Sequence, residues 1–356
     1  MDVLFLPDYT DFNPYQDELA SWLRQRGHSV SFSDRYVVPI LRGYRESSPD
    51  VIHVHWLHRF TLADSFLLTA VKTAQLFLEL LVVQLLTESA IVWTVHNRRE
   101  HEKRWPLLEK YVRTIFVIGF CDRVIVHCPA AEEIIMDELY LPERARNRIS
   151  VVPHGNYIDV YQNEISATEA KNRLGVSNDE RVLLFIGSIR PYKQVPKLID
   201  SFGRVDASQM RLLVAGKPWN RQLARRIEEQ CAGYDNVDLT LEMIPEEEFQ
   251  VYLNAADAVV LPFEESVLTS GSVLLAMSFG KALVVPRVGC LPETVPQQGR
   301  IMYDPDHDGA LQTAIETAPE VDLEALGEAN LAAARDLHWG YVAGETMAVY
   351  DAVRGG

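Results

Sequence analysis

Residues 182 to 197, Val-Leu-Leu-Phe-Ile-Gly-Ser-Ile-Arg-Pro-Tyr-Lys-Gln-Val-Pro-Lys, decide the fold of this chain. The stretch begins with a continuous apolar run, turns at Gly187, and places two cations, Arg190 and Lys193, ahead of a helix. A continuous apolar run bounded by such a turn is typical of a parallel strand that is buried on both faces. The two cations would then lie at the carboxyl end of that strand, where parallel sheets bind ligands.

A second element runs from Leu261 to Gly280, Leu-Pro-Phe-Glu-Glu-Ser-Val-Leu-Thr-Ser-Gly-Ser-Val-Leu-Leu-Ala-Met-Ser-Phe-Gly. It is predicted to be the end of a strand, an acidic loop, a turn of small residues and a helix. Free amides at a helix start, with hydroxyls beside them, favour phosphate or ribose, although an ordinary helix cap has the same composition. The residues of this turn are Thr269, Ser270, Gly271 and Ser272.

Charged residues in these loops suit a phosphorylated sugar ligand. A diphosphate needs cations and amide donors, which hold the ligand and neutralise a leaving group. Arg190 and Lys193 supply cations, and Lys217, after the glycine turn of the next strand, adds a third; simple solvation is the alternative for all three. Glu264 and Glu265 cannot favour an anion, so they either bond sugar hydroxyls or are solvated loop acids.

The pattern of the whole chain is α/β. Apolar strand-like runs alternate with helical stretches along both halves of the 356 residues, which predicts two doubly wound parallel sheets. With 47% hydrophobic and 24% charged residues the chain has an ordinary globular composition, and a net charge of −16 excludes the basic face that nucleic acids require. The four cysteines form no Cys-x-x-Cys pair, so reducing cytosol is the simplest compartment.

Here the chain resembles the glycosyltransferases of the GT-B fold, in particular family 4, over nearly all of its length. The loop Gly187-Ser-Ile-Arg-Pro-Tyr-Lys-Gln is similar to the Gly-Arg-Leu-x-x-x-Lys-Gly of that family. The other matching segments are Leu213-Val-Ala-Gly-Lys, Ala256-Asp-Ala-Val-Val-Leu-Pro, Leu274-Leu-Ala-Met-Ser-Phe-Gly, Gly289-Cys-Leu-Pro-Glu, Asp50-Val-Ile-His-Val-His-Trp, Gly27-His-Ser-Val and Val152-Pro-His-Gly.

The resemblance implies GT-B architecture, in which two Rossmann-like domains face a cleft. Residues 1–160 would bind the acceptor, residues 166–336 would bind the nucleotide-sugar, and residues 337–356 would form a helix that packs back on the first domain. The implied activity is transfer of a hexose, such as mannose from GDP-mannose or a sugar from a UDP-sugar, to a saccharide or lipid-linked saccharide. No tightly bound cofactor and no metal are implied.

The resemblance also assigns roles to the donor residues, with two departures. Lys193 would contact the diphosphate, and the helix that starts at Ser270 would close over the ribose and phosphates. The usual arginine of the family falls on Ser188, so Arg190 would replace it. The usual Glu-x7-Glu pair aligns with Val267 and Leu275, so a shifted carboxylate, Glu265 or its neighbour, would have to act in catalysis.

In the first half, His96 follows the apolar strand Ile91 to Trp93 and would face the ligand at its carboxyl end. It could hydrogen-bond the donor sugar or take a proton from the acceptor hydroxyl; a structural histidine is the alternative. Further acceptor contacts are predicted from Asn97, His101, Glu102 and Tyr15. His53 and His55 share one strand face, but no carboxylate at ligand spacing completes a zinc site.

The stretch from Phe66 to Leu86 is apolar enough to raise the question of a membrane, but it contains Lys72 and Glu79. We expect a long, mostly buried helix, with a surface that rests on lipid as the alternative. The enzyme would then be cytoplasmic, with the inner face of the membrane as a second location.

Two other functions stay open: a nucleotide-sugar epimerase of the same fold, and a non-catalytic partner subunit of a glycosyltransferase.

Overall fold

The structure is a computed structural model that describes residues 1–11, 13–33, 37–99, 105–264 and 267–354. The chain divides into two compact units, each built on its own sheet: Met1–Gly155 with His338–Gly356, and Asn156–Leu337. Both sheets have six strands, and every strand pair within them is parallel. The predicted α/β class with two parallel sheets is confirmed.

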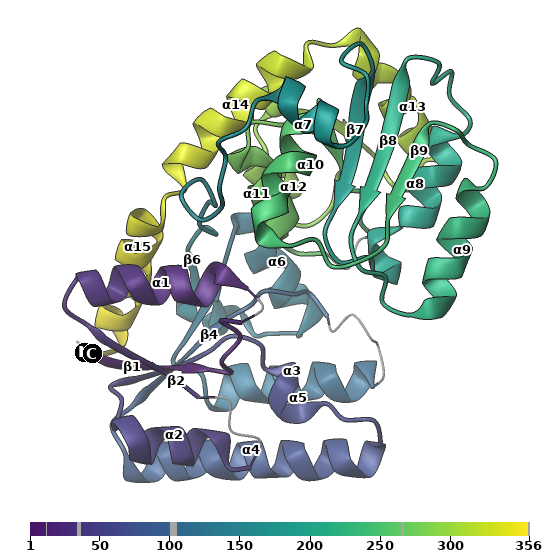
Figure 1. Ribbon diagram of the computed structural model, residues 1–356. Helices are drawn as coiled ribbons and strands as arrows, with labels where there is room; N and C mark the ends of the chain where they lie inside the picture. Colours follow the sequence, from purple (N-terminus) through teal and green to yellow (C-terminus); the bar gives the residue numbers. More distant parts are fainter. Residues whose placement is uncertain (12, 34–36, 100–104, 265–266, 355–356) are drawn as a thin grey trace. The chain divides into compact units, whose positions relative to one another are not determined.

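The first unit has the strand order β2-β1-β3-β4-β5-β6. Figure 1 shows α1 and α15 on one face of this sheet and α2 and α4 on the other. The strands are β1 (Asp2–Leu6), β2 (Ser29–Phe32), β3 (Val51–Val54), β4 (Ala90–Thr94), β5 (Arg123–Val126) and β6 (Ile149–Val151). The helices are α1 (Pro14–Gln25), α2 (Pro39–Ser47), α3 (His58–Thr61), α4 (Phe66–Leu86), α5 (Pro106–Gly119), α6 (Pro129–Glu138) and α15 (Trp339–Arg354).

Local sequence explains where these helices begin. Asn13 caps α1 by accepting a hydrogen bond from the Tyr15 amide, and Pro14 occupies the first helical position. Ser65 caps α4 in the same way through the Leu68 amide. The final helix, α15, packs against α1 and β4, so the end of the chain completes the first unit.

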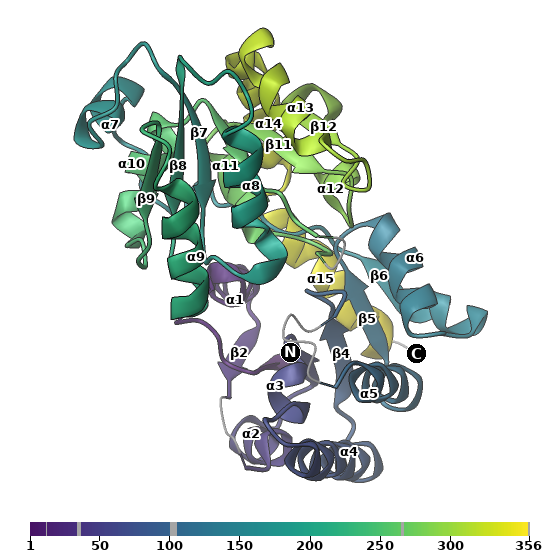
Figure 2. The same ribbon diagram turned by 90° about the vertical axis from the view of Figure 1, so that its right-hand side faces the viewer.

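The second unit has the strand order β12-β11-β10-β7-β8-β9. Helices α8, α9 and α13 form one group, whereas α11 and α14 pack together beside β11 (Figure 2). The strands are β7 (Arg181–Ile186), β8 (Met210–Ala215), β9 (Val237–Thr240), β10 (Ala258–Val260), β11 (Ala282–Pro286) and β12 (Arg300–Tyr303). The helices are α7 (Ala167–Arg173), α8 (Val195–Phe202), α9 (Arg221–Cys231), α10 (Phe249–Ala255), α11 (Gly271–Ser278), α12 (Leu291–Thr294), α13 (Ala310–Thr317) and α14 (Leu323–Asp336).

The chain reverses its direction across this second sheet between β7 and β10. From β7 the chain proceeds to β8 and β9 on one side, then returns to β10 and continues outward on the other. At such a switch point the loops after the two central strands diverge and leave room for a ligand. The loops that follow β7 and β10 are those that contain Lys193 and Glu264.

Two glycines fix the loops after β7 and β8 against each other. Gly216 has a φ of 152°, and a Cβ atom there would lie 1.9 Å from the Gly187 carbonyl oxygen. The Ile189 amide donates to the Lys217 carbonyl at 2.9 Å, and the Trp219 amide donates to the Ile189 carbonyl at 2.8 Å. The two loops therefore form one continuous layer at the carboxyl end of the sheet.

The expectation that the helix Phe66–Leu86 is mostly buried is wrong. It is the one helix among the described residues that is long and apolar enough to cross a membrane, yet only 33% of its most apolar window is buried. Leu76, Leu80 and Val83 face the protein, while Leu67 and Leu85 are among its exposed side chains. Apolar composition predicts a preference for burial, but it does not say that another layer of the protein covers the helix.

We predict that Gly216→Ala destabilises the second unit by at least about 2 kcal/mol, since its Cβ would overlap a backbone oxygen. A thermal unfolding experiment would show the loss as a lower Tm. Gly233→Ala is the matched control, because a Cβ there meets no atom within 4 Å. An unchanged Tm for Gly216→Ala would contradict the close packing of the two loops.

Candidate functional site

Lys193 lies in a buried cradle at the end of β7. A Cβ atom on Gly187 would lie 3.4 Å from Lys193 Nζ and 3.2 Å from Ser272 Oγ, so these three residues come together. Lys193 is 7% exposed, and burial, reinforced by the nearby charge of Arg190, lowers its pKa to about 8. A buried ammonium group is costly unless an anion offsets its charge, so the cradle is chemically suited to a phosphate.

Arg190 stands beside this cradle and is held by an aromatic ring. Its guanidinium carbon lies 4.3 Å above the centroid of the Trp219 ring, which is a cation–π contact. Trp219 follows β8 and remains 45% exposed. Lys217 is also exposed, and only its backbone is tied to the β7 loop. The structure therefore fixes Arg190 but leaves the Lys217 side chain in solvent.

The first turn of α11 faces the same cradle through Ser272. Ser270 is the N-cap residue of α11, but its side chain makes no capping hydrogen bond. The first amide groups of the helix are therefore left for another acceptor. A Cβ atom on Gly271 would lie 3.1 Å from the Tyr157 hydroxyl oxygen, so Tyr157 borders this helix start. Thr269 is half-buried in the preceding turn. These features fit an anion site better than a self-capped helix.

Glu264 connects the loops after β7 and β10. Its carboxylate accepts a hydrogen bond from Gln194 Nε2 at 2.5 Å, and its amide donates to the Tyr192 carbonyl at 3.0 Å. Glu265 lies outside the described residues. Val267 and Leu275, at the positions where the resemblance leads us to expect paired carboxylates, are buried apolar side chains. Glu264 is therefore the described carboxylate of this loop that borders the cradle.

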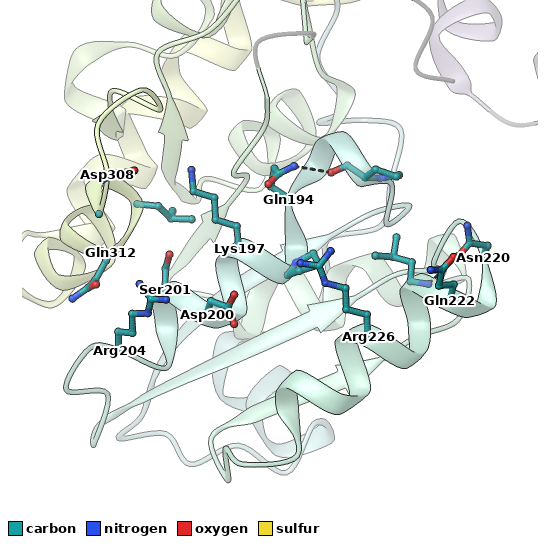
Figure 3. Close-up of a pocket in the computed structure, with 15 residues that line it drawn as sticks. Gln194, Lys197, Asp200, Ser201, Arg204, Asn220, Gln222, Arg226, Asp308 and Gln312 are labelled. Atoms are coloured by element: carbon teal, nitrogen blue, oxygen red, sulfur yellow. Dashed lines mark hydrogen bonds between the residues drawn. The ribbon is translucent and has the colours of Figure 1, made fainter. Parts of the chain in front are cut away.

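A separate groove of about 770 Å³ lies along α8, toward α9 and α13 (Figure 3). Charged side chains such as Lys197, Arg204 and Arg226 line it, as does Gln194, which donates to the Pro191 carbonyl. Lys193 does not belong to this lining. The groove is thus an open polar surface next to the loop, and the buried cation lies outside it.

In the first unit, four neighbouring strands are each followed by a buried imidazole. The cluster consists of His53 and His55 from the end of β3, His96 after β4, His127 after β5 and His154 after β6. Neighbouring rings are in contact, with centroids 4.2 Å apart for His53 and His55 and 5.4 Å apart for His127 and His154. No set of metal-binding geometry occurs among the residues that the structure describes. The cluster is therefore a packed layer of rings.

Burial keeps these imidazoles neutral. It lowers the pKa of His53 and His154 to about 3 and that of His127 to about 4. It also holds the pKa of His55 and His96 well below the ordinary value, with further contributions from neighbouring imidazoles. At neutral pH each ring therefore offers one N–H donor and one lone-pair acceptor.

The hydrogen bonds of the cluster show which imidazole rings use both nitrogens within the protein and which keep one nitrogen for a ligand. His53 uses both nitrogens, since Nδ1 is 2.6 Å from the Tyr350 hydroxyl and Nε2 is 2.7 Å from Thr94 Oγ1. His96 uses Nε2, which lies 3.2 Å from His55 Nδ1, and its ring stacks on Trp56 with centroids 4.5 Å apart. No described residue makes a hydrogen bond to His96 Nδ1, which leaves that atom for a ligand.

The other predicted acceptor residues fall into three groups. Asn97 lines a cavity of about 30 Å³ beside His96, together with Trp56 and His58, which is room for a water molecule or two. Tyr15 is 1% exposed and packs edge-on against His96, and its ring also contacts His127 and His154. His101 and Glu102 lie outside the described residues.

Comparison with known proteins identifies the second unit. Residues 180–319 match the model of the family described as glycosyl transferases group 1. This match lies entirely within the second unit. The match contains the Lys193 loop, the Glu264 loop and α11, so the cradle belongs to the part of the chain that defines the family.

Relatives and solved structures are similar to this chain over most or all of its length. The chain is 27% identical over 303 residues to a GDP-mannose:glycolipid 4-beta-D-mannosyltransferase from Xanthomonas campestris, covering 84% of this chain and 78% of that protein. Sucrose-phosphate synthase from Thermosynechococcus elongatus has a TM-score of 0.77 at 18% identity, with 99% of both chains covered. HepE from Anabaena in complex with UDP has a TM-score of 0.72 at 16% identity, covering 99% of this chain and 100% of that one.

These comparisons confirm the predicted resemblance, the GT-B fold and the enzyme class of glycosyltransferase. They leave the individual site residues as predictions. Three aromatic residues that border the sites, Trp219, Tyr157 and Trp56, were missed from the sequence. Their loop positions were a weak signal, because aromatic side chains in loops often have no ligand.

We predict that the stability of the first unit falls steeply on acidification. The unfolded imidazoles have a pKa of about 6.5, so below that pH the unfolded state binds more protons than the folded state. The free energy of unfolding should then decrease by up to about 1.4 kcal/mol per pH unit for each buried imidazole. Urea unfolding between pH 7.5 and 5 would measure the slope.

Exposed His307, whose side chain is 78% accessible, supplies the control for this experiment. His307→Gln should leave the slope unchanged, whereas His127→Gln should reduce it by the contribution of one imidazole. A stability that stays constant from pH 7.5 to 5 would show that the cluster does not stay neutral in the folded protein.

Proposed function

We propose that this glycosyltransferase transfers a hexose from a nucleotide-sugar to a saccharide or lipid-linked saccharide. The observation that carries the proposal is the buried Lys193 ammonium group, which shares a cradle with Gly187 and Ser272. A diphosphate would offset the charge of Lys193 and accept hydrogen bonds from the first amides of α11. Arg190, fixed on Trp219, would contact a second phosphate oxygen.

The donor residues would act mainly on the leaving group. In the transfer, the bond between C1 of the sugar and the phosphate oxygen breaks, and the bonding electrons stay on the nucleoside diphosphate. The charge of Lys193 and Arg190 stabilises that growing negative charge. Glu264 and Glu265 are proposed to bond sugar hydroxyls, with Glu265 acting close to the reacting carbon. Thr269, Ser270, Gly271 and Lys217 complete the predicted donor contacts.

The first unit is proposed to bind the acceptor, with His96 as its catalytic residue. Nδ1 of His96 would either hydrogen-bond the donor sugar or take the proton of the acceptor hydroxyl as its oxygen attacks C1. His55 holds Nε2 of the same ring, which orients the imidazole. Asn97, His101, Glu102 and Tyr15 are proposed to shape the pocket around it.

The choice of donor and acceptor draws on the relatives. A GDP-mannose:glycolipid mannosyltransferase is similar over most of the chain, and a UDP complex shares the fold. We therefore propose GDP-mannose first and a UDP-sugar second, with a glycolipid as acceptor. The enzyme would act in the cytoplasm at the inner face of the membrane, without a tightly bound cofactor.

Two alternatives share the phosphate cradle. An epimerase of the same fold would bind the nucleotide-sugar and release an altered one with no acceptor. A non-catalytic partner subunit would account for the buried apolar residues Val267 and Leu275, where the family has carboxylates. The mannosyltransferase relative favours transfer over both.

We predict that donor affinity depends on pH through Lys193. With a pKa of about 8 the ammonium group is charged at pH 7 and loses its proton above pH 8. The Kd for GDP-mannose or UDP-glucose should therefore rise as the pH increases from 7 to 9, approaching tenfold per pH unit. Isothermal titration calorimetry would measure this, and Lys193→Ala should weaken binding at pH 7 by about 10-fold to 100-fold.

Lys197→Ala is the matched control, since Lys197 is an exposed lysine of α8, four residues after Lys193. It should bind the donor as the wild type does. Equal donor affinity for Lys193→Ala and the wild type would exclude Lys193 from the donor site, and failure of every nucleotide to bind the wild type would contradict the proposed function.

We predict that His96→Ala lowers the rate of sugar transfer by about 10²-fold to 10⁴-fold while donor binding persists. A radiolabelled-sugar transfer assay would report the rate, and calorimetry would report the donor Kd. His307→Ala, at an exposed position, should change neither. Donor binding with no transfer by the wild type would favour the partner subunit, and an altered free sugar nucleotide would identify an epimerase.

A further inference from the structure

Exposed apolar side chains gather on two neighbouring helices of the first unit. Among the described residues, twelve of the eighteen large hydrophobic side chains that are exposed belong to α4 and α5. We call them the α4–α5 face; its members are Phe66, Leu67, Leu68, Val71, Leu78, Leu81, Leu85, Leu86, Leu107, Tyr111, Ile115 and Ile118. Monomeric soluble proteins rarely expose apolar patches of this kind unless the patch binds something.

The two helices form one continuous surface. The Phe66 ring lies 5.4 Å from the Trp105 ring where both helices begin, and Gln84 Nε2 donates to the Gly119 carbonyl at 3.0 Å near their ends. These two contacts show that the helices run in the same direction, and Figure 2 shows them side by side. Their exposed sides together span the width of two helices over most of the length of α4.

The members of the face are uncharged, the charged residues of α4 are turned inward, and Lys110 of α5 is half-buried with its Nζ 3.4 Å from the Tyr140 ring centroid. Lys72 Nζ donates to the Arg59 carbonyl at 2.9 Å and to the Leu62 carbonyl at 3.0 Å. Glu79 is 2% exposed and accepts the amide hydrogen of Ile40 at 2.9 Å. In α5, Arg113 is also buried. Only an uncharged, apolar partner matches such a surface.

The position of the face favours a lipid bilayer over a second protein chain. Since α4 and α5 follow the parallel strands β3 and β4, both begin at the sheet edge that carries His96. The small cavity beside His96 is lined in part by Glu109 and Val112 from the first turns of α5. Phe66 and Trp105 are in contact at this end, and such aromatic side chains favour the membrane–water interface.

Within α4 the residues Leu67, Val71, Leu78, Leu81 and Leu85 recur at spacings of three, four or seven, which by itself also suits pairing with another helix. Leu107, Tyr111, Ile115 and Ile118 widen the surface beyond such a seam. A broad, flat, apolar surface matches a bilayer better than a single partner helix.

We propose that the α4–α5 face docks this enzyme on a lipid bilayer, with the helices lying in the interface rather than crossing it. The other side of α4 packs on the protein through Leu76, Leu80 and Val83, so the helix cannot leave the unit to span the membrane. This inference rests on the proposed function, because a lipid-linked acceptor would present its sugar at the end of the face that carries His96.

Burial of apolar area, not charge, provides the binding energy in this proposal. The chain has a net charge of −16, so attraction to anionic lipids cannot supply it. Binding should therefore occur on vesicles of neutral phosphatidylcholine and persist at high salt, which weakens only electrostatic contacts. Added anionic phosphatidylglycerol should not strengthen it.

The test is flotation of the full chain with phosphatidylcholine vesicles. The triple variant Leu67→Gln, Leu78→Gln, Leu85→Gln should bind at least about 100-fold more weakly, because three exposed leucines no longer enter the lipid. Met243→Gln removes an equally exposed hydrophobic side chain from the second unit and should float as the wild type does. Thermal unfolding would verify that all variants are folded.

The remaining outcomes separate the possibilities. If the wild type does not float, or if the triple variant floats equally well, the proposal is wrong. A wild-type dimer in analytical ultracentrifugation that the triple variant converts to a monomer, without vesicle binding, would assign the face to a second copy of the chain. Donor affinity measured on the same samples tests the proposed function separately, because the substituted leucines lie outside the donor unit.

Discussion

Burial of both faces of each parallel sheet is the constraint on which the rest of this structure depends. Strands such as β3, β4 and β10 are buried at every residue, so their side chains serve the core and cannot meet a ligand. Chemistry is left to the loops at the carboxyl ends of the strands. Lys193 and Glu264 follow the two central strands of the second sheet, and His96 follows a central strand of the first.

The buried basic side chains at the carboxyl ends of the strands are charged in the second sheet and neutral in the first. In the second unit, Lys193 retains a charge at neutral pH although it is buried, and a ligand anion would offset that charge. In the first unit, the imidazoles of His55 and His96 are packed against one another, and their burial removes the charge. A cationic site suits a diphosphate, whereas a neutral imidazole suits hydroxyl groups.

The sequence predicted the parts of this arrangement that depend on local pattern. The apolar run at Val182 to Ile186 identified β7 to within one residue, and the glycine turn located the Lys193 loop. What it could not predict depends on distant partners. Trp219 supports Arg190 only because Gly216 lets the β8 loop approach Gly187, and the lowered pKa of Lys193 arises from burial that no local pattern encodes.

The α4 helix shows a second limit of prediction from sequence. Its composition indicated a preference for an apolar environment, and the expectation of a mostly buried helix assumed that the protein itself would supply one. The described fold buries only the side of α4 that includes Leu76 and Val83 and leaves Leu78 exposed. Solvent exposure of that surface costs free energy in proportion to its apolar area. A second apolar phase would offset this cost, and the proposed lipid-linked acceptor would bring the enzyme to such a phase.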